Sequence, residues 1–302
     1  MTGTARTAGT GTTGTTPARD DRRVVLVTGA SSGIGRAAAI AFADRARTGT
    51  GPDSGTAGVR LVLAARREDD LRETAQQSDP DAVIVPCDLA TQAGIDQLLA
   101  VVRDQLGRLD VLVNNAGVGG DGPFDAPDAL EQADRMLALN LRTPIALTHE
   151  LLPLLRASRG AVVNVSSVAG LIGTPDAEVY SSTKWALTGF SEALRASQSR
   201  HGVHVACVQP GPVPTPGWPH ARLAGSWWGR RVLASTADEI GRTIERASRR
   251  RGSVAPVRPR TYAVLPLLRG LAPWLVRRLL GGAARRDVRS RLHAPVDQDP
   301  VA

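Results

Sequence analysis

The chain has 302 residues, of which 42% are hydrophobic, and this size and composition fit one large domain with its own core. Two cysteines, Cys87 and Cys207, exclude a disulfide-stapled scaffold, and both lie in apolar runs typical of buried thiols in a reducing compartment. No HExxH or CxxC spacing occurs, so no metal site is expected.

The net charge of +8 is unevenly placed, because residues 222–302 hold 17 arginines against 6 acidic residues. The basic character therefore belongs to the C-terminal part of the chain, and without a binding motif it does not predict a nucleic-acid partner. Residues 1–21 are rich in threonine and glycine and contain no apolar run. We expect a disordered tail there, no secretory signal and a cytoplasmic location.

Short apolar runs alternate with segments of helical composition from residue 22 to residue 260. Strands are expected at 23–27, 59–65, 82–86, 110–114, 161–166 and 204–209, with a seventh at 253–257. Helices are expected at 36–45, 68–77, 95–106 and 180–200, with a helix pair at 129–156 that bends near Pro144, and residues 46–58 form an inserted loop. This alternation predicts an α/β fold, a doubly wound parallel sheet with helices on both faces, in a single domain.

A glycine-rich turn follows the first strand, with the sequence TGASSGIG at residues 28–35. Its spacing is GxxxGxG and not the general GxGxxG of dinucleotide sites, but the physical basis is the same. Glycines let the backbone approach a pyrophosphate, and the following helix offers free N–H groups at its positive end. The turn is therefore a candidate cofactor site, formed by Gly29, Ser31, Ser32, Gly33, Ile34 and Gly35.

The second strand ends without a carboxylate and is followed by Arg66 and Arg67. An acidic residue at this position would bond the ribose 2′-hydroxyl of NAD(H), whereas a guanidinium suits the 2′-phosphate of NADP(H). NADP(H) is therefore favoured over NAD(H), with Arg66 as the phosphate ligand. The alternative interpretation makes both arginines a solvated helix start.

The ends of the third and fourth strands carry further candidates for cofactor binding. Asp88, followed by Leu89, would accept from the adenine amino group or cap the next helix, and the sequence alone does not separate these roles. After the fourth strand comes NNAG at residues 114–117, where Asn115 offers a side-chain amide and Ala116 and Gly117 leave room for the cofactor.

Tyr180 and Lys184 lie four residues apart on one predicted helix, so their side chains share one face. A nearby cation stabilises a phenolate and makes tyrosine a usable acid or base near neutral pH. Lys184 is the only lysine in a chain with 36 arginines. Ser167 follows the fifth strand, 13 residues before Tyr180, where a hydroxyl can bond a substrate oxygen. The neighbouring Ser166 is expected to face away.

Taken together and in this order, the motifs resemble the short-chain dehydrogenase/reductase family over residues 23–215, and the resemblance implies a Rossmann-like fold. It also implies that Ser167 positions a carbonyl, Tyr180 is the acid/base, Lys184 binds the nicotinamide ribose, and Asn140 holds a water of the proton relay. Further cofactor contacts are implied for Pro210, Gly211 and Thr215 after the sixth strand.

The predicted function is hydride transfer between NADP(H) and a carbonyl or alcohol carbon. The alternative is a catalytically silent NADP(H)-binding regulator or scaffold. The resemblance implies that residues 212–236 cover the substrate. Their three tryptophans favour a bulky apolar substrate, although ordinary packing would explain them too. The resemblance suggests a homo-oligomer. The basic, leucine-rich residues 261–302 suit either packing on protein or contact of residues 261–280 with a membrane surface.

Overall fold

The computed structural model describes residues 21–48, 58–119, 124–214, 235–249, 257–258, 260–272 and 274. The predictions for residues 1–20 of the N-terminal tail, for residues 49–57 of the inserted loop and for most of the tryptophan-rich segment lie outside the described residues. Thr215 and everything after Trp274 also lie outside them. Residues 46–48, which were predicted as the start of the inserted loop, instead belong to helix α1 (Gly33–Thr48).

Among the described residues, seven strands form one parallel sheet in the order β3-β2-β1-β4-β5-β6-β7. The apolar runs of the sequence become strands because this sheet is covered on both sides, and every residue of β4 and β5 is buried. The predicted doubly wound parallel sheet is confirmed. The strands are β1 (Arg23–Thr28), β2 (Val59–Ala65), β3 (Val83–Pro86), β4 (Val111–Asn114), β5 (Ala161–Val165), β6 (His204–Pro210) and β7 (Val257–Arg258).

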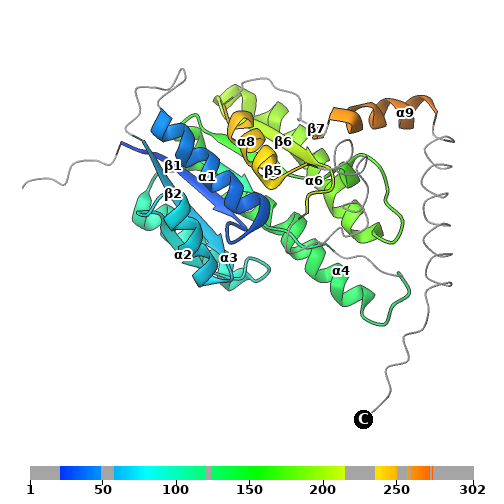
Figure 1. Cartoon of the computed structure of the whole chain (residues 1–302), viewed down its shortest axis with the longest axis horizontal. Coiled ribbons are helices and arrows are strands. Elements are labelled where there is room, and N and C mark those ends of the chain that lie inside the picture. Colours follow the sequence, from blue (N-terminus) through cyan, green and yellow to red (C-terminus); the bar gives the residue numbers. More distant parts are fainter. Residues whose placement is uncertain are drawn as a thin grey trace, which may run out of the picture.

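Alternating strand residues divide the core between the two faces of the sheet. Val25 and Val27 of β1 pack in one cluster with residues of α1 (Gly33–Thr48), α2 (Glu68–Gln77) and α8 (Ala237–Ala247), all three visible in Figure 1. On the opposite face, Val24 and Leu26 pack with residues of α3 (Gln92–Ala100) and α5 (Thr143–Ala157). The period of two along each strand thus places helices on both faces.

Two of the predicted helical segments, 95–106 and 129–156, contain irregular turns. The α3 helix continues as the π-helical η1 (Val101–Leu106) and ends at Gly107, whose φ of 62° is left-handed. The predicted helix at 129–156 divides into α4 (Ala129–Leu137), the π-helical η2 (Ala138–Arg142) and α5. The irregular turn precedes Pro144, which lies in the first turn of α5, where a missing N–H costs nothing.

The remaining elements come after β5 in the chain. They are η3 (Val168–Gly170), α6 (Glu178–Gln198), η4 (Ser199–His201), η6 (Arg260–Val264) and α9 (Leu265–Leu271). The α6 helix was expected at 180–200 and begins two residues earlier. Both cysteines are buried as predicted, and burial raises the pKa of the Cys87 thiol to about 11, with Asp88 as a second cause.

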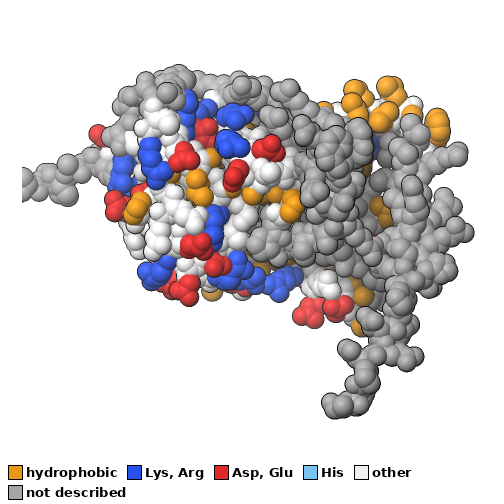
Figure 2. Space-filling model, viewed as in Figure 1, with side chains coloured by type: hydrophobic (Ala, Val, Ile, Leu, Met, Phe, Trp, Pro, Cys, Tyr) orange, Lys and Arg blue, Asp and Glu red, His pale blue; other side chains and the backbone are white. Residues whose placement is uncertain are grey.

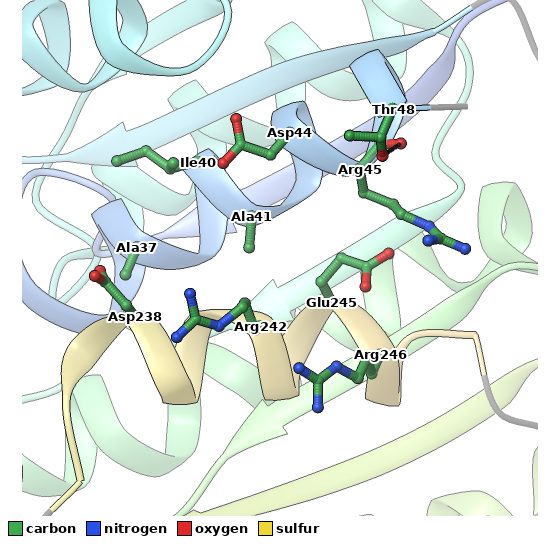
Figure 3. A pocket seen from close by; sticks show the side chains of 10 residues that line it. All are labelled: Ala37, Ile40, Ala41, Asp44, Arg45, Thr48, Asp238, Arg242, Glu245 and Arg246. Atoms are coloured by element: carbon green, nitrogen blue, oxygen red, sulfur yellow. Dashed lines mark hydrogen bonds between the residues drawn. The ribbon is translucent and has the colours of Figure 1, made fainter. Parts of the chain in front are cut away.

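Helix α8 was not among the predicted helices. Thr236 and Glu239 form a capping box at its start, which is the sequence signal that would have found it. It packs tightly along α1, because Gly241 lies where a Cβ would overlap the backbone of Ala37. Figure 3 shows the two helices side by side, flanking a surface groove of about 430 Å³. The groove is lined by Ala37, Ile40, Ala41, Asp44, Arg45, Thr48, Asp238, Arg242, Glu245 and Arg246, none of them a predicted site residue.

Candidate active site

The predicted site residues gather at the carboxyl ends of β1, β4, β5 and β6. In the sheet, β1 lies beside β4, and the strand order runs outward from this pair in both directions. Open parallel sheets bind ligands at the carboxyl ends of strands where the order reverses in this way. The glycine-rich turn follows β1 and the NNAG segment follows β4, so both border this switch point.

The glycines of the first turn are required by the packing of the protein itself. Gly29 has a φ of 67°, and a Cβ there would lie 2.9 Å from the backbone of Ala116. A Cβ on Gly35 would overlap the carbonyl oxygen of Gly29 and lie 2.7 Å from Nδ2 of Asn115. Gly33, with a φ of 54°, begins α1, whose first N–H groups have no partner within the helix. The turn is held close to β4 and leaves the helix start as an anion site.

Thr28 and Asn115 join the two loops of the switch point. The Thr28 hydroxyl donates to the Val113 carbonyl and accepts from the backbone N–H groups of Asn115 and Ala116, each at 3.0 Å. The Asn115 amide donates back to the Thr28 carbonyl at 3.0 Å. The Asn115 side chain therefore fixes the glycine turn, and Ala116 adds no bulk where the loops meet.

Arg67 lies over the glycine-rich turn. Its Nη2 donates to Oγ of Ser31 at 3.4 Å and to Oγ of Ser32 at 3.3 Å, while its Nε pairs with Asp70 in the first turn of α2. Arg66 is exposed at the end of β2. The sequence prediction chose Arg66 for the 2′-phosphate, but Arg67 is the guanidinium with contacts to the turn. Adjacent arginines after a strand cannot be ranked from sequence, because the loop decides where each one points.

Asp88 does not cap the helix that follows it. Thr91 is the N-cap of α3, and its hydroxyl accepts from the Gly94 N–H at 3.1 Å. The Asp88 carboxylate accepts from the Ala90 N–H at 3.0 Å and stays half-buried after β3. The capping interpretation is therefore wrong, while adenine recognition by Asp88 stays a prediction. Leu89, beside it, is buried in the core.

The two serines after β5 have different surroundings. Ser166 Oγ donates to the Lys184 carbonyl at 2.9 Å and lies 3.0 Å from the Thr188 hydroxyl, so it binds α6. Ser167 is the N-cap of η3, where its Oγ accepts from the Ala169 N–H at 3.1 Å. A hydroxyl that already accepts keeps its own hydrogen available to donate. Ser167 is the serine that can bond a substrate oxygen.

Tyr180 and Lys184 lie in the first two turns of α6, as the i, i+4 spacing predicts. The Lys184 Nζ is 5.7 Å from the centroid of the Tyr180 ring and donates to the Val165 carbonyl, at the end of β5, at 3.0 Å. Lys184 is 5% exposed, and this burial lowers its pKa to about 8, with Cys207 acting in the opposite direction. The side chain thus places a buried ammonium beside the phenol.

Asn140 connects the β4 loop to α6. It lies in the π-helical turn η2 and is fully buried. Its Oδ1 accepts from the Val118 N–H at 2.8 Å, and its Nδ2 donates to the Val118 carbonyl at 2.8 Å and to the Thr183 hydroxyl at 3.3 Å. Gly117 lies beside it, where a Cβ would be 3.0 Å from Oδ1 of Asn140 and 3.6 Å from Nζ of Lys184. The space kept open by Gly117 adjoins the lysine.

A buried polar ladder behind the site was not predicted. Asn114 of β4 donates to Oδ1 of Asn164 on β5 at 2.8 Å, and Asn164 donates to Ser191 of α6 at 2.8 Å. Asparagines within apolar strands are the signal for it, since buried amides need partners. Pro210 ends β6, followed by the buried Gly211, whereas the predicted contact Thr215 lies outside the described residues.

The comparisons with known proteins agree with this geometry. A family model described as short chain dehydrogenase matches residues 23–223. The chain is 34% identical over 221 residues to mouse (Mus musculus) L-fucose dehydrogenase, covering 73% of this chain and 76% of the relative. It is 33% identical over 204 residues to a 3beta-hydroxysteroid dehydrogenase of Mediterraneibacter gnavus, covering 66% of this chain and 68% of the relative.

A solved structure gives the same result. A metagenomic short-chain oxidoreductase in complex with NADP superposes with a TM-score of 0.61 at 29% identity, covering 78% of this chain and 95% of that one. The chain belongs to the short-chain dehydrogenase/reductase family. It is an NAD(P)-dependent oxidoreductase that acts on CH–OH or C=O groups and takes a small-molecule substrate.

The part of the chain that the structure describes contains neither a membrane-spanning helix nor a cluster of metal ligands. No helix there is long and apolar enough to span a membrane. Within the same described residues, no group of three or more histidine, cysteine or acidic side chains is placed to hold a metal ion.

Proposed function

We propose that this oxidoreductase uses NADP(H) to interconvert a ketone and an alcohol in a bulky apolar substrate, with Tyr180 as the acid/base. The observation that carries the proposal is the placement of the only lysine of the chain. Lys184 is buried beside the Tyr180 ring, at the strand ends where Ser167 presents its hydroxyl. A scaffold without turnover would have no use for a buried cation next to a phenol.

The residues fit a nicotinamide dinucleotide. The start of α1, with Ser31, Ser32 and Gly33, would take the pyrophosphate. Asp88 would accept from the adenine amino group, and the opening at Gly117 would admit the ribose next to Lys184. The lysine ammonium has three N–H groups and uses one on the Val165 carbonyl, so it has donors for ribose hydroxyls.

The chain's own residues supply the proton chemistry. When it is bound, the cofactor supplies or accepts the hydride. In the direction of reduction, Tyr180 donates its proton to the carbonyl oxygen, and the Ser167 hydroxyl donates a hydrogen bond to the same oxygen. In the direction of oxidation, the phenolate takes the proton back from the alcohol.

Lys184 and Asn140 assist Tyr180 in different ways. Because the lowered pKa of Lys184 is about 8, its side chain is mostly the charged ammonium at pH 7 and stabilises the phenolate. Asn140 uses its side chain on Val118 and Thr183, so it positions the β4 loop against α6. We assign any water held at Asn140 for proton relay to its backbone, because the side-chain amide is engaged.

The choice of NADP(H) is supported by the guanidinium over the glycine turn. Arg67 contacts Ser31 and Ser32, and Arg66 is adjacent and exposed. Neither position offers the carboxylate that would bond a ribose 2′-hydroxyl and repel a 2′-phosphate. Two arginines at this edge favour a dianionic phosphate.

A bulky apolar substrate is supported by the segment that follows Ser167 and by one relative. Residues 168–172 have the sequence VAGLI, which carries no charge next to the catalytic serine. The similar Mediterraneibacter gnavus protein is named a 3beta-hydroxysteroid dehydrogenase, whereas the mouse relative is named for a sugar. The sequence that follows β6 also holds tryptophans at 218, 227 and 228.

The test is a substrate screen with the purified protein. NADPH absorbance would be followed with ring ketones of increasing size and, in the reverse direction, with NADP⁺ and the matching alcohols and L-fucose. We expect kcat/KM to rise with ring size and to be low for the sugar. Preference for the sugar would overturn the apolar assignment, and no turnover with any carbonyl or alcohol would overturn the proposed reaction. Light scattering of the same sample tests the expected homo-oligomer.

A further inference from the structure

The C-terminal end of the described chain presents an apolar stripe to the surroundings. Val264 is 51% exposed, Leu267 65%, Leu271 85% and Trp274 61%. Leu267 and Leu271 lie four residues apart and therefore on one side of α9, while Val264 is the N-cap of this helix and Trp274 follows its C-cap, Ala272. Figure 2 shows hydrophobic side chains gathered over α9, in the upper right of the view, whereas the face over α1 and α2 is a mixture of charges. We call these four residues the α9 stripe.

The α9 segment is attached to the rim of the active site. The Arg269 guanidinium lies 4.1 Å from the Trp185 ring centroid, and its Nη1 donates to the Leu171 carbonyl at 3.3 Å. Trp185 is the neighbour of Lys184, and Leu171 follows Ser167 by four residues. The α9 segment is therefore held against α6, which carries Lys184, and against the end of η3, which follows Ser167.

The surroundings of the stripe in the sequence carry one sign of charge. Residues 246–286 contain 11 arginines and no aspartate or glutamate. Leucines and a tryptophan next to arginines are the composition of segments that lie in the interface of an anionic bilayer. Tryptophan prefers the headgroup level, and arginines there meet lipid phosphates.

We propose that the α9 stripe docks on the surface of an anionic phospholipid bilayer, with the active-site rim next to the membrane. The charge argues against a second copy as the occupant. A two-fold contact centred on α9 would bring this arginine-rich, acid-free segment against itself, so like charges would oppose the association. The proposal goes beyond the oxidoreductase function and does not depend on it, because docking needs no cofactor or substrate.

The test is co-flotation of the full-length protein with phospholipid vesicles. One set contains phosphatidylcholine with about 30% phosphatidylglycerol, and the other contains phosphatidylcholine alone. The test variant is Leu267→Glu/Leu271→Glu, which places charges on the stripe. The matched control is Leu130→Glu, because Leu130 is a similarly exposed leucine (75%) on α4, away from the stripe.

We expect the wild-type protein and Leu130→Glu to float with the anionic vesicles and not with the neutral ones. The double variant should bind at least about tenfold more weakly, since it loses two leucines from the interface and adds negative charge. Nicotinamide cofactor binding, measured in the same samples, verifies that the variants are folded. If the double variant is unfolded, the comparison of anionic with neutral vesicles for the wild-type protein decides whether the protein docks on an anionic bilayer.

Two outcomes would overturn the proposal. The first is wild-type protein that does not bind the anionic vesicles, and the second is a folded double variant that binds them as well as wild type. If the first outcome comes with a loss of oligomer mass in the double variant, a second copy covers the stripe.

Discussion

At the catalytic edge, side chains from distant parts of the sequence hold one another through buried and partly buried hydrogen bonds. The α9 segment instead reaches the same edge through Arg269 and leaves Leu267 and Leu271 exposed. Thr28 joins the backbone of Asn115 and Ala116 across 87 and 88 residues of sequence, and Asn140 joins Val118 to Thr183. The candidate site is therefore part of the packed scaffold, whereas α9 is an added segment that is attached to it at the surface.

The largest effect is expected from removal of the proton donor, Tyr180, at the catalytic edge. Tyr180→Phe keeps the ring and its packing but removes the hydroxyl, so kcat should fall by about 10²–10⁴-fold while cofactor affinity is retained. Single-turnover oxidation of NADPH and a fluorescence titration on the same preparation measure both quantities. Turnover that survives in this variant would remove Tyr180 from the acid/base role.

The next effect separates the two serines after β5. Ser167→Ala should lower kcat by about 10²–10³-fold, because the hydrogen bond to the developing oxyanion is lost. Ser166→Ala is the matched control and should leave kcat within a few fold, while lowering the free energy of unfolding by about 1 kcal/mol through the lost bonds to α6. Equal losses of kcat in the two variants would contradict the assignment of the substrate contact to Ser167.

Cofactor choice should depend on the arginines after β2. Arg67→Ala should weaken NADPH binding by about tenfold to a hundredfold and leave NADH nearly unchanged, because a charge-assisted contact with the 2′-phosphate is lost. Arg66→Ala is the companion variant. If Arg66 alone carries the NADPH-specific loss, the contact of Arg67 with Ser31 and Ser32 is packing and the sequence-based choice of Arg66 was right.

The packing of the glycine turn gives a smaller effect, on stability. Gly35→Ala places a Cβ against the Gly29 carbonyl and the Asn115 amide, so the free energy of unfolding should fall by about 1–3 kcal/mol. Gly189→Ala on α6 is the control, since its Cβ would meet no atom within 4 Å, and it should raise that free energy by about 0.5–1 kcal/mol. Urea denaturation measures both, and a Gly35→Ala protein as stable as wild type would contradict the close approach.

A further effect on stability is a pH dependence from Lys184. The folded pKa is lowered to about 8, while an unfolded lysine titrates near ~10.4, so the unfolded chain binds more protons between these values. The free energy of unfolding contributed by Lys184 should therefore increase as pH rises from about 8 to ~10.4, and the burial penalty is present in full below pH 8. The difference between wild type and Lys184→Met, measured by urea denaturation across this range, should follow that slope, and a constant difference would contradict the lowered pKa.

Much of the scaffold was predictable from sequence because a parallel sheet buried on both faces needs continuous apolar strands. The glycine turn and the Tyr180–Lys184 spacing were also predictable, because both are local sequence patterns. Helix α8 was not predicted, although Thr236 and Glu239 form the capping box at its start. The proline- and tryptophan-rich sequence just before it is typical of a loop. The contacts of Arg67 and the bonds of Asn140 depend on loop paths and on partners 22 or more residues away, which no local pattern records.

A fluorescence titration of the purified protein with NADPH and with NADH tests most directly whether the catalytic edge is a working NADP(H) site. We expect tight binding of NADPH and much weaker binding of NADH. Tight NADH with weak NADPH would contradict the role given to the arginines after β2 and leave the proton chemistry standing. Binding of neither would contradict the assignment of this edge as the cofactor site.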